Sequence, residues 1–218
     1  MFQQVREVKC TTSAPGKLVL FMHGVGSDCD DLISLASYFQ PILSDAVFLS
    51  PNGIEQYDVA PFGYQWFSLS DRSPAKMQAS MEQNHKLINQ SIEHELTRRG
   101  LQWEDLILIG FSQGVAAALY TLMTVGRRLH AAIGFSGFLI PPVVKNITKQ
   151  AQETPVCLIH GINDDVLPVA ALTKSAGALS NYGFDVKTCI IPELQHSIDN
   201  HGLTFAINFL QDIQHMQS

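Results

Sequence analysis

The 218-residue sequence predicts an α/β protein built on a mostly parallel central sheet, and three features support this prediction. Short apolar runs alternate with segments of helical periodicity along the chain. The apolar runs are continuous, as expected for strands that are covered by helices on both faces. No internal repeat, low-complexity tract or linker divides the sequence. We therefore expect a single domain over residues 1–218, with its core from about residue 15 to about residue 212.

The expected elements follow from apolar pattern and from breaker residues. The predicted strands cover residues 18–22, 46–50, 105–110, 131–135, 155–160 and 184–191. The predicted helices cover residues 32–39, about 75–99, 115–125, 168–180 and 201–214. In the first helix, Asp30 or Asp31 is the expected N-cap and Pro41 the expected stop. Gly100 and Gly126 mark the ends of the next two helices.

Composition and charge exclude several classes of protein. With 46% hydrophobic and 16% charged residues, the chain is neither intrinsically disordered nor a long coiled coil. The net charge is −6 and the basic residues are scattered, so no nucleic-acid partner is expected. No apolar run approaches the roughly 20 residues that span a bilayer, and the N-terminus has no apolar signal core. Four widely spaced cysteines without a CxxC pattern favour reduced thiols and a cytoplasmic protein.

Residues 54–76 form a long segment without helical or strand periodicity. It is too long for an ordinary connection, so we expect a functional loop near the site. Its apolar side chains allow two interpretations: they line an acyl groove, or they fold the loop onto the core. The candidate substrate-binding residues are Phe62, Trp66, Phe67 and Leu69.

Residues 110–114 read Gly-Phe-Ser-Gln-Gly and match the G-x-S-x-G pattern of a nucleophile turn. The match alone is weak, but a predicted strand precedes it and a small-residue helix follows it. The flanking glycines allow a sharp strand-to-helix turn in which the serine is strained. Ser112 is therefore the candidate nucleophile, and the alternative is a serine that only caps the helix.

A serine nucleophile needs a base, and the base needs an orienting carboxylate. Asp164 and Asp165 follow the strand at 155–160, at the sheet edge where ligand sites of α/β proteins lie. Spacing alone leaves both aspartates as candidates. Asp165 has the alternative role of capping the next helix.

His196 is the candidate base because it lies between the last predicted strand and the last predicted helix. His23 and His160 end strands and are expected to shape the site. The histidines show no i, i+4 or HxH spacing, so no metal site is expected. For the oxyanion, the backbone N–H of Gln113 and one N–H from the glycine-rich loop at 23–26, that of Val25, are the expected donors.

The sequence resembles the phospholipase/carboxylesterase family of α/β-hydrolases in four segments: residues 23–26 (HGVG), 110–114 (GFSQG), 160–164 (HGIND) with Pro168, and 196–197 (HS). The family includes acyl-protein thioesterases, lysophospholipases and small bacterial carboxylesterases. The resemblance implies the α/β-hydrolase fold without a separate cap domain. It also implies a Ser112–Asp164–His196 triad, which selects Asp164 over Asp165, and oxyanion donors at Val25 and Gln113. Family members need no cofactor and are often homodimers.

The sequence departs from the family pattern at Val25, Val115 and Asp165, where the family commonly has Leu, Gly and Pro. These changes leave the chemistry intact. Ser68 replaces the aspartate of the family's Trp-Phe-Asp, at a position that the resemblance places beside the pocket. We therefore expect that the substrates of the better-known thioesterases do not transfer directly.

We expect a serine carboxylesterase for short- to medium-chain acyl esters or thioesters that works through an acyl-enzyme. Lysophospholipase or acyl-protein thioesterase activity is the alternative, with a lysophospholipid or an acylated protein as substrate. A non-catalytic ligand-binding relative is the alternative from another class. Peptidase and dienelactone-hydrolase activities are further uses of such a triad, although the latter enzymes often carry a cysteine nucleophile.

Overall fold

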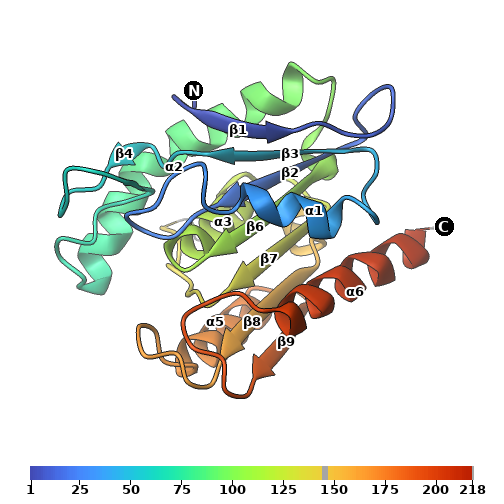
Figure 1. Cartoon of the computed structure of the whole chain (residues 1–218). Helices are drawn as coiled ribbons and strands as arrows, with labels where there is room; N and C mark the ends of the chain where they lie inside the picture. Colours follow the sequence, from blue (N-terminus) through green and yellow to red (C-terminus); the bar gives the residue numbers. More distant parts are fainter. Residues whose placement is uncertain (144–146, 218) are drawn as a thin grey trace.

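The computed structural model describes residues 1–143 and 147–217, and within these ranges a seven-stranded sheet crosses the molecule (Figure 1). Its strands are β1 (Val5–Val8), β2 (Lys17–Met22), β3 (Ala46–Pro51), β6 (Leu106–Phe111), β7 (Ala131–Phe135), β8 (Val156–Gly161) and β9 (Val186–Ile191). They lie in the order β1-β3-β2-β6-β7-β8-β9. Strand β1 runs antiparallel to β3, and the other neighbouring strands pair in parallel. The predicted α/β fold with a mostly parallel sheet is confirmed.

Helices cover both faces of this sheet (Figure 1). The helical elements are η1 (Ile33–Leu35), α1 (Ala36–Phe39), α2 (Pro74–Thr97), η2 (Trp103–Asp105), α3 (Gln113–Thr124), α4 (Lys149–Gln152), α5 (Ala170–Asn181) and α6 (Asn200–Gln217). Successive strand residues point to opposite faces. Leu20 and Leu108 therefore join one core cluster with Ile88 of α2, while Phe21 joins a second cluster with Phe209 of α6. This double coverage explains why the strands read as continuous apolar runs.

Strand β1 has no counterpart among the predicted strands. Its sequence is Val-Arg-Glu-Val, and its two charged residues are exposed at the edge of the sheet. A half-polar run of four residues lacks the continuous apolar pattern that marks the inner strands.

The helical segment predicted over 32–39 is shorter and less regular than expected, because it divides into the 3-10 turn η1 and the single turn α1. The two expected N-cap residues bind elsewhere. Asp30 pairs with Arg6, and Asp31 accepts a hydrogen bond of 2.8 Å from the Ser27 hydroxyl. Residues 54–76 also contain a short hairpin, β4 (Glu55–Gln56) and β5 (Tyr64–Gln65), within the segment predicted to be irregular.

The carboxyl ends of the parallel strands lie along one edge of the sheet and bring the candidate site residues there. Met22 at the end of β2 is in register with Gly110 of β6, so the loop at 23–26 lies beside Ser112. Gly161 at the end of β8 is in register with Ile191 of β9. The segments that hold Asp164 and His196 therefore leave the same edge.

Among the helices within the described ranges, none is both long enough and apolar enough to cross a membrane.

His130, just before β7, gives a testable pH dependence of stability. The side chain is 6% exposed. Burial, together with the charges of Lys17 and Arg128, lowers its pKa to about 4. The pKa of an unfolded histidine is about 6.5. Between these two values the unfolded chain binds a proton that the folded chain does not bind, so stability falls as the pH falls.

We expect the His130→Gln variant to lose this part of the pH dependence. Between about pH 6.5 and pH 4, the free energy of unfolding of the wild type should fall by roughly 1.4 kcal/mol per pH unit more than that of the variant. Urea unfolding of both proteins at several pH values measures this difference. Parallel curves would show that His130 titrates alike in the folded and unfolded chains.

Candidate active site

Ser112 lies in a sharp turn between β6 and α3. Its φ is 52° and its ψ is −115°, a region that residues with a side chain rarely adopt. The turn is anchored on the neighbouring strand, because the Ser112 N–H donates a 3.0 Å hydrogen bond to the carbonyl of Phe135. The side chain is partly exposed at the N-terminus of α3. This is the strained strand-turn-helix geometry that the G-x-S-x-G pattern predicts.

The two glycines of the pattern are required by the close approach of backbone segments. A Cβ at Gly110 would lie 2.6 Å from the backbone nitrogen of Val115. A Cβ at Gly114 would lie 1.9 Å from the carbonyl oxygen of Met22 and 2.8 Å from that of His23. Helix α3 therefore packs directly against the end of β2, which brings Ser112 beside the loop at 23–26.

We expect Gly114→Ala to destabilise the protein by roughly 3 kcal/mol or more, because its methyl group meets backbone atoms that cannot move independently. The matched control is Gly177→Ala in α5, where an added Cβ meets no atom within 4 Å. Replacing glycine within a helix should stabilise the protein by about 0.5–1 kcal/mol. Chemical denaturation of both variants measures the two effects. Similar stability of the two variants would contradict the proposed packing of α3 on β2.

Ser112, His196 and Asp164 form a continuous chain of hydrogen bonds. His196 Nε2 lies 2.9 Å from Ser112 Oγ, and His196 Nδ1 lies 2.8 Å from Asp164 Oδ2. The imidazole also packs near the Phe111 ring, with 5.0 Å between the ring centroids. The structure thus brings together the three side chains that the sequence predicts, although they come from three separate loops.

Asp164 is buried and its carboxylate is held from several sides. Its Oδ1 accepts hydrogen bonds from the N–H groups of Val166, at 3.0 Å, and Leu167, at 2.7 Å. Burial opposes ionisation, but the hydrogen bonds from His196 and from these two amides outweigh it and lower the pKa of Asp164. The neighbouring Asp165 is exposed. The geometry therefore agrees with Asp164 as the residue that orients the histidine.

A second imidazole also contacts Asp164. His160 Nε2 lies 3.1 Å from Asp164 Oδ2 and 2.8 Å from the carbonyl oxygen of Leu167. The carbonyl can only accept, so Nε2 carries the proton and donates. His160 thereby fixes the loop that carries Asp164, in keeping with the expectation that this histidine shapes the site.

The two predicted oxyanion donors lie beside Ser112. Val25 and Gln113 line the same cavity as Ser112. Within the described ranges, neither backbone N–H donates a hydrogen bond to another residue. Unpaired amides at this place are available to a developing negative charge.

His23 supports the loop that carries Val25. The Gly53 N–H donates to His23 Nε2 at 2.9 Å, so the proton is on Nδ1, which donates to the Gly24 carbonyl at 2.7 Å. Burial lowers the pKa of His23 and keeps the ring neutral in this arrangement. Trp66 Nε1 donates a 2.9 Å hydrogen bond to the His23 carbonyl.

The Gln113 side chain holds the 54–76 segment. Its Oε1 accepts a 2.9 Å hydrogen bond from the Trp66 N–H, and its Nε2 donates a 2.7 Å hydrogen bond to the Phe67 carbonyl. The residue after Ser112 thus has two separate functions in the structure: its backbone borders the cavity, and its side chain attaches the long loop to the core.

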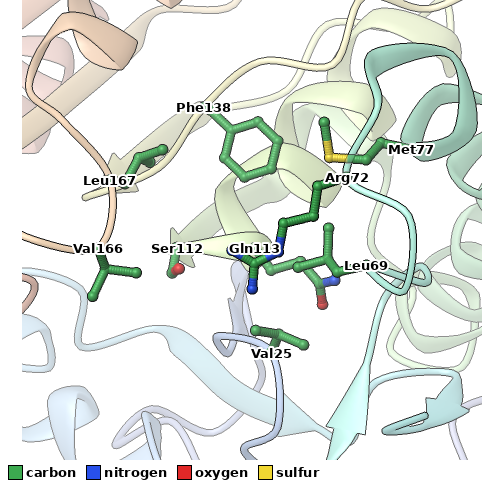
Figure 2. A pocket seen from close by; sticks show the side chains of 9 residues that line it. All are labelled: Val25, Leu69, Arg72, Met77, Ser112, Gln113, Phe138, Val166 and Leu167. Carbon is green, nitrogen blue, oxygen red and sulfur yellow. The ribbon is translucent and has the colours of Figure 1, made fainter. Parts of the chain in front are cut away.

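A cavity of about 280 Å³ opens beside Ser112 (Figure 2). It is lined by Val25, Leu69, Arg72, Met77, Ser112, Gln113, Phe138, Val166 and Leu167. Of the four candidate substrate-binding residues, the structure places Leu69 in this lining. Trp66 and Phe67 are fully buried in the core, and Phe62 is 72% exposed and lies outside the lining. For Trp66 and Phe67, the structure favours the interpretation that they fold the loop onto the core.

Sequence reasoning missed several residues of this cavity. Val166 and Leu167 lie two and three residues after Asp164, and their position close to the acid is a usable signal. Arg72 lies within the 54–76 segment, but it is charged, so the apolar pattern of that segment does not mark it as a lining residue. Met77 and Phe138 carry no local signal, because only the packing of α2 and the segment after β7 brings them to Ser112.

The described residues contain one group of three side chains close enough to share a metal ion: Asp28, Cys29 and Asp30. Burial raises the pKa of the Cys29 thiol, which disfavours the thiolate form that binds metals. Asp30 is already paired with Arg6. None of the three residues lines the cavity beside Ser112.

Comparison with known proteins identifies the family of the chain. A protein-family model described as Phospholipase/Carboxylesterase matches residues 3–214. The chain belongs to the phospholipase/carboxylesterase family. The resemblance noted in the sequence is therefore confirmed over nearly the whole length, and the protein is a carboxylic ester hydrolase with the α/β-hydrolase fold.

Individual known proteins are also similar to this chain. Esterase YpfH from Escherichia coli is 28% identical over 197 residues, which cover 89% of this chain and 82% of the relative. Acyl-protein thioesterase 1 from Saccharomyces cerevisiae is 27% identical over 186 residues, 77% of this chain and 82% of the relative. The crystal structure of esterase PE8 aligns with a TM-score of 0.86 and 32% identity, covering 95% of this chain and 97% of PE8.

Proposed function

We propose that this family member is a serine carboxylesterase that hydrolyses short- to medium-chain acyl esters or thioesters, with Ser112, His196 and Asp164 as its catalytic residues. The observation that carries the proposal is the hydrogen-bond chain from Asp164 through His196 to a strained serine that borders an apolar cavity. The family accounts for ester hydrolysis in general. The contacts of these three residues support the more specific mechanism.

In the first step, Ser112 Oγ attacks the substrate carbonyl carbon while His196 Nε2 accepts the hydroxyl proton. The negative charge that develops on the carbonyl oxygen is stabilised by the N–H groups of Val25 and Gln113. Asp164 holds the Nδ1–H tautomer of His196 and stabilises the imidazolium. His196 then gives its proton to the leaving alcohol or thiol, and an acyl-enzyme remains. In the second step, His196 accepts a proton from water as the water attacks the acyl-enzyme. His196 then returns a proton to Ser112 Oγ, and the carboxylic acid is released.

Cavity size supports the proposed chain length. Ligand pockets commonly enclose about 300–1,000 Å³. The cavity beside Ser112, at about 280 Å³, is slightly smaller than this range and is lined mainly by apolar side chains. We propose that the chain forms one catalytic domain without a cap, so substrate selection depends on the lining of this cavity.

A lysophospholipase or acyl-protein thioesterase remains the second candidate, and the similarity to acyl-protein thioesterase 1 of yeast favours it. Such substrates carry longer acyl chains, which would have to extend beyond the cavity. The presence of all three connected side chains favours an enzyme over a non-catalytic binding relative.

We place the enzyme in the cytoplasm, which the four unpaired cysteines support. A homodimer is proposed on the family resemblance alone.

The test is a hydrolysis series with the wild type and a Ser112→Ala control. It uses p-nitrophenyl acetate, butyrate, octanoate and palmitate, matching acyl thioesters, and a lysophosphatidylcholine. We expect the highest kcat/KM with the short and medium chains, and turnover by the Ser112→Ala control that is lower by about 10⁵–10⁶-fold. A preference for palmitoyl substrates or for the lysophospholipid would support the second candidate. A folded wild type without activity on any of these substrates would contradict the proposal.

A further inference from the structure

Arg72 is the charged side chain among the nine residues that line the cavity beside Ser112. Figure 2 shows it extending from the wall into the cavity, with its guanidinium between Ser112 and Leu69 in this view. The surrounding side chains of Val25, Met77 and Phe138 are apolar. A cation in such a lining is unexpected if the cavity only binds hydrocarbon.

The guanidinium has no partner among the residues that the structure describes. Arg6 and Arg99 form ion pairs with acidic residues, whereas Arg72 forms no ion pair or hydrogen bond within the described ranges. The adjacent Asp71 accepts a 2.9 Å hydrogen bond from the Ser73 N–H at the start of α2. The Arg72 donors are therefore free for a ligand, and a guanidinium matches the two oxygens of a carboxylate.

The position of His196 indicates which part of a substrate meets Arg72. His196 must protonate the leaving group, so the leaving group lies on the histidine side of Ser112. A second cavity of about 290 Å³ lies there, lined by Asp31, Leu32, Leu35, Phe111, His196, Ser197 and Ile198. The Arg72 cavity contains Ser112 and both proposed oxyanion donors, and it receives the acyl part.

The two cavities carry charged side chains of opposite sign. The leaving-group side contains the Asp31 carboxylate, which repels an anionic leaving group. The acyl side contains the unpaired Arg72. A negative group on the acyl chain is therefore favoured, and one on the leaving group is disfavoured.

On the basis of the proposed esterase function, we propose that Arg72 makes the enzyme selective for acyl groups that end in a carboxylate, that is, for half-esters or half-thioesters of short dicarboxylic acids. The apolar walls contact the methylene groups of the chain, and the guanidinium binds the terminal carboxylate. Arg72 is a specificity-determining residue that takes no part in the proton transfers at Ser112.

The alternative function of Arg72 is to cover the apolar wall with its aliphatic stem while the guanidinium stays in water. The variants Arg72→Met and Arg72→Lys separate these functions. Methionine keeps an apolar stem without the charge. Lysine keeps the charge without the planar fork.

The experiment compares two p-nitrophenyl esters that differ in the end of the acyl chain, the hexanoate and the hydrogen adipate. Adipate is used because shorter half-esters form cyclic anhydrides without an enzyme. We expect Arg72→Met to lower kcat/KM for the adipate by about tenfold and to leave the hexanoate nearly unchanged, with an intermediate value for Arg72→Lys. Added salt should weaken the wild-type preference for the adipate, because Arg72 is exposed to solvent.

A second pair of substrates tests the side on which the charge is recognised. It consists of phenyl acetate and its p-carboxyphenyl analogue, which carries the carboxylate on the leaving group. The inference is overturned if Arg72→Met changes the adipate and the hexanoate equally, or if Arg72 favours the p-carboxyphenyl ester instead. If the wild type hydrolyses the hexanoate but Arg72 has no effect, this inference alone fails. If the folded wild type hydrolyses no ester, the proposed function fails as well.

Discussion

Ser112→Ala is expected to lower kcat for ester hydrolysis by about 10⁵–10⁶-fold, the range found when the nucleophile of a serine triad is removed. The alanine methyl group occupies the place of Cβ in the strained turn, so the fold is kept while the oxygen that attacks the ester is lost. Steady-state kinetics with p-nitrophenyl butyrate measure the loss. Ser44→Ala is the matched control, because Ser44 is exposed and its carbonyl, rather than its hydroxyl, accepts the hydrogen bonds of Thr11.

The residual activity of Ser112→Ala shows whether Ser112 or another group attacks the ester, and the Ser44→Ala control shows whether a loss comes from damage to the fold. A folded Ser112→Ala protein with kcat within about tenfold of the wild type would show that another group performs the attack, since a triad without its nucleophile retains little activity. Loss of activity in Ser44→Ala as well would indicate damage to the fold. Thermal unfolding of each variant separates these cases.

Asp164→Asn is expected to lower kcat by about 10⁴-fold, because an amide cannot hold the His196 tautomer that accepts the proton of the serine. The shape of the site should be kept, since the oxygen of asparagine can still accept hydrogen bonds from Val166 and Leu167. The measurement is kcat with the same ester. Asp165→Asn is the matched control, because Asp165 is adjacent in sequence but exposed. The control should keep kcat within about twofold of the wild type, as expected for a surface change away from the site.

The pair of variants also tests the choice between the two aspartates. A large loss in Asp165→Asn together with wild-type activity in Asp164→Asn would contradict the hydrogen bond between Asp164 and His196 as the functional contact. Equal and modest effects of both would mean that neither carboxylate orients the histidine.

The inner part of the fold could be predicted from sequence because both faces of its strands are covered. Strand β6 reads Leu-Ile-Leu-Ile-Gly-Phe, and its first five residues are buried. Strand β1 could not be predicted in the same way. It lies at the edge of the sheet, and half of its side chains face solvent.

Some residues of the candidate site could be predicted from sequence, and others could not. Ser112 could be predicted because a strained strand-to-helix turn needs glycines at fixed places. Spacing alone did not choose between Asp164 and Asp165, since the choice depends on which carboxylate meets His196 in space. Most of the cavity lining could not be predicted from composition. Trp66 has a large aromatic side chain of the kind that often lines pockets. In the structure it is buried in the core, where its indole N–H donates a hydrogen bond to the His23 carbonyl.

Labelling of the folded protein with a fluorophosphonate, followed by mass spectrometry of its peptides, tests the proposed mechanism most directly, because the probe reports an activated serine without any choice of substrate. We expect one covalent adduct per chain, on Ser112, in the wild type. Ser112→Ala should form none, and Asp164→Asn should react more slowly. A folded wild-type protein without an adduct at Ser112, or with its adduct on another residue, would contradict the assignment of Ser112 as the nucleophile.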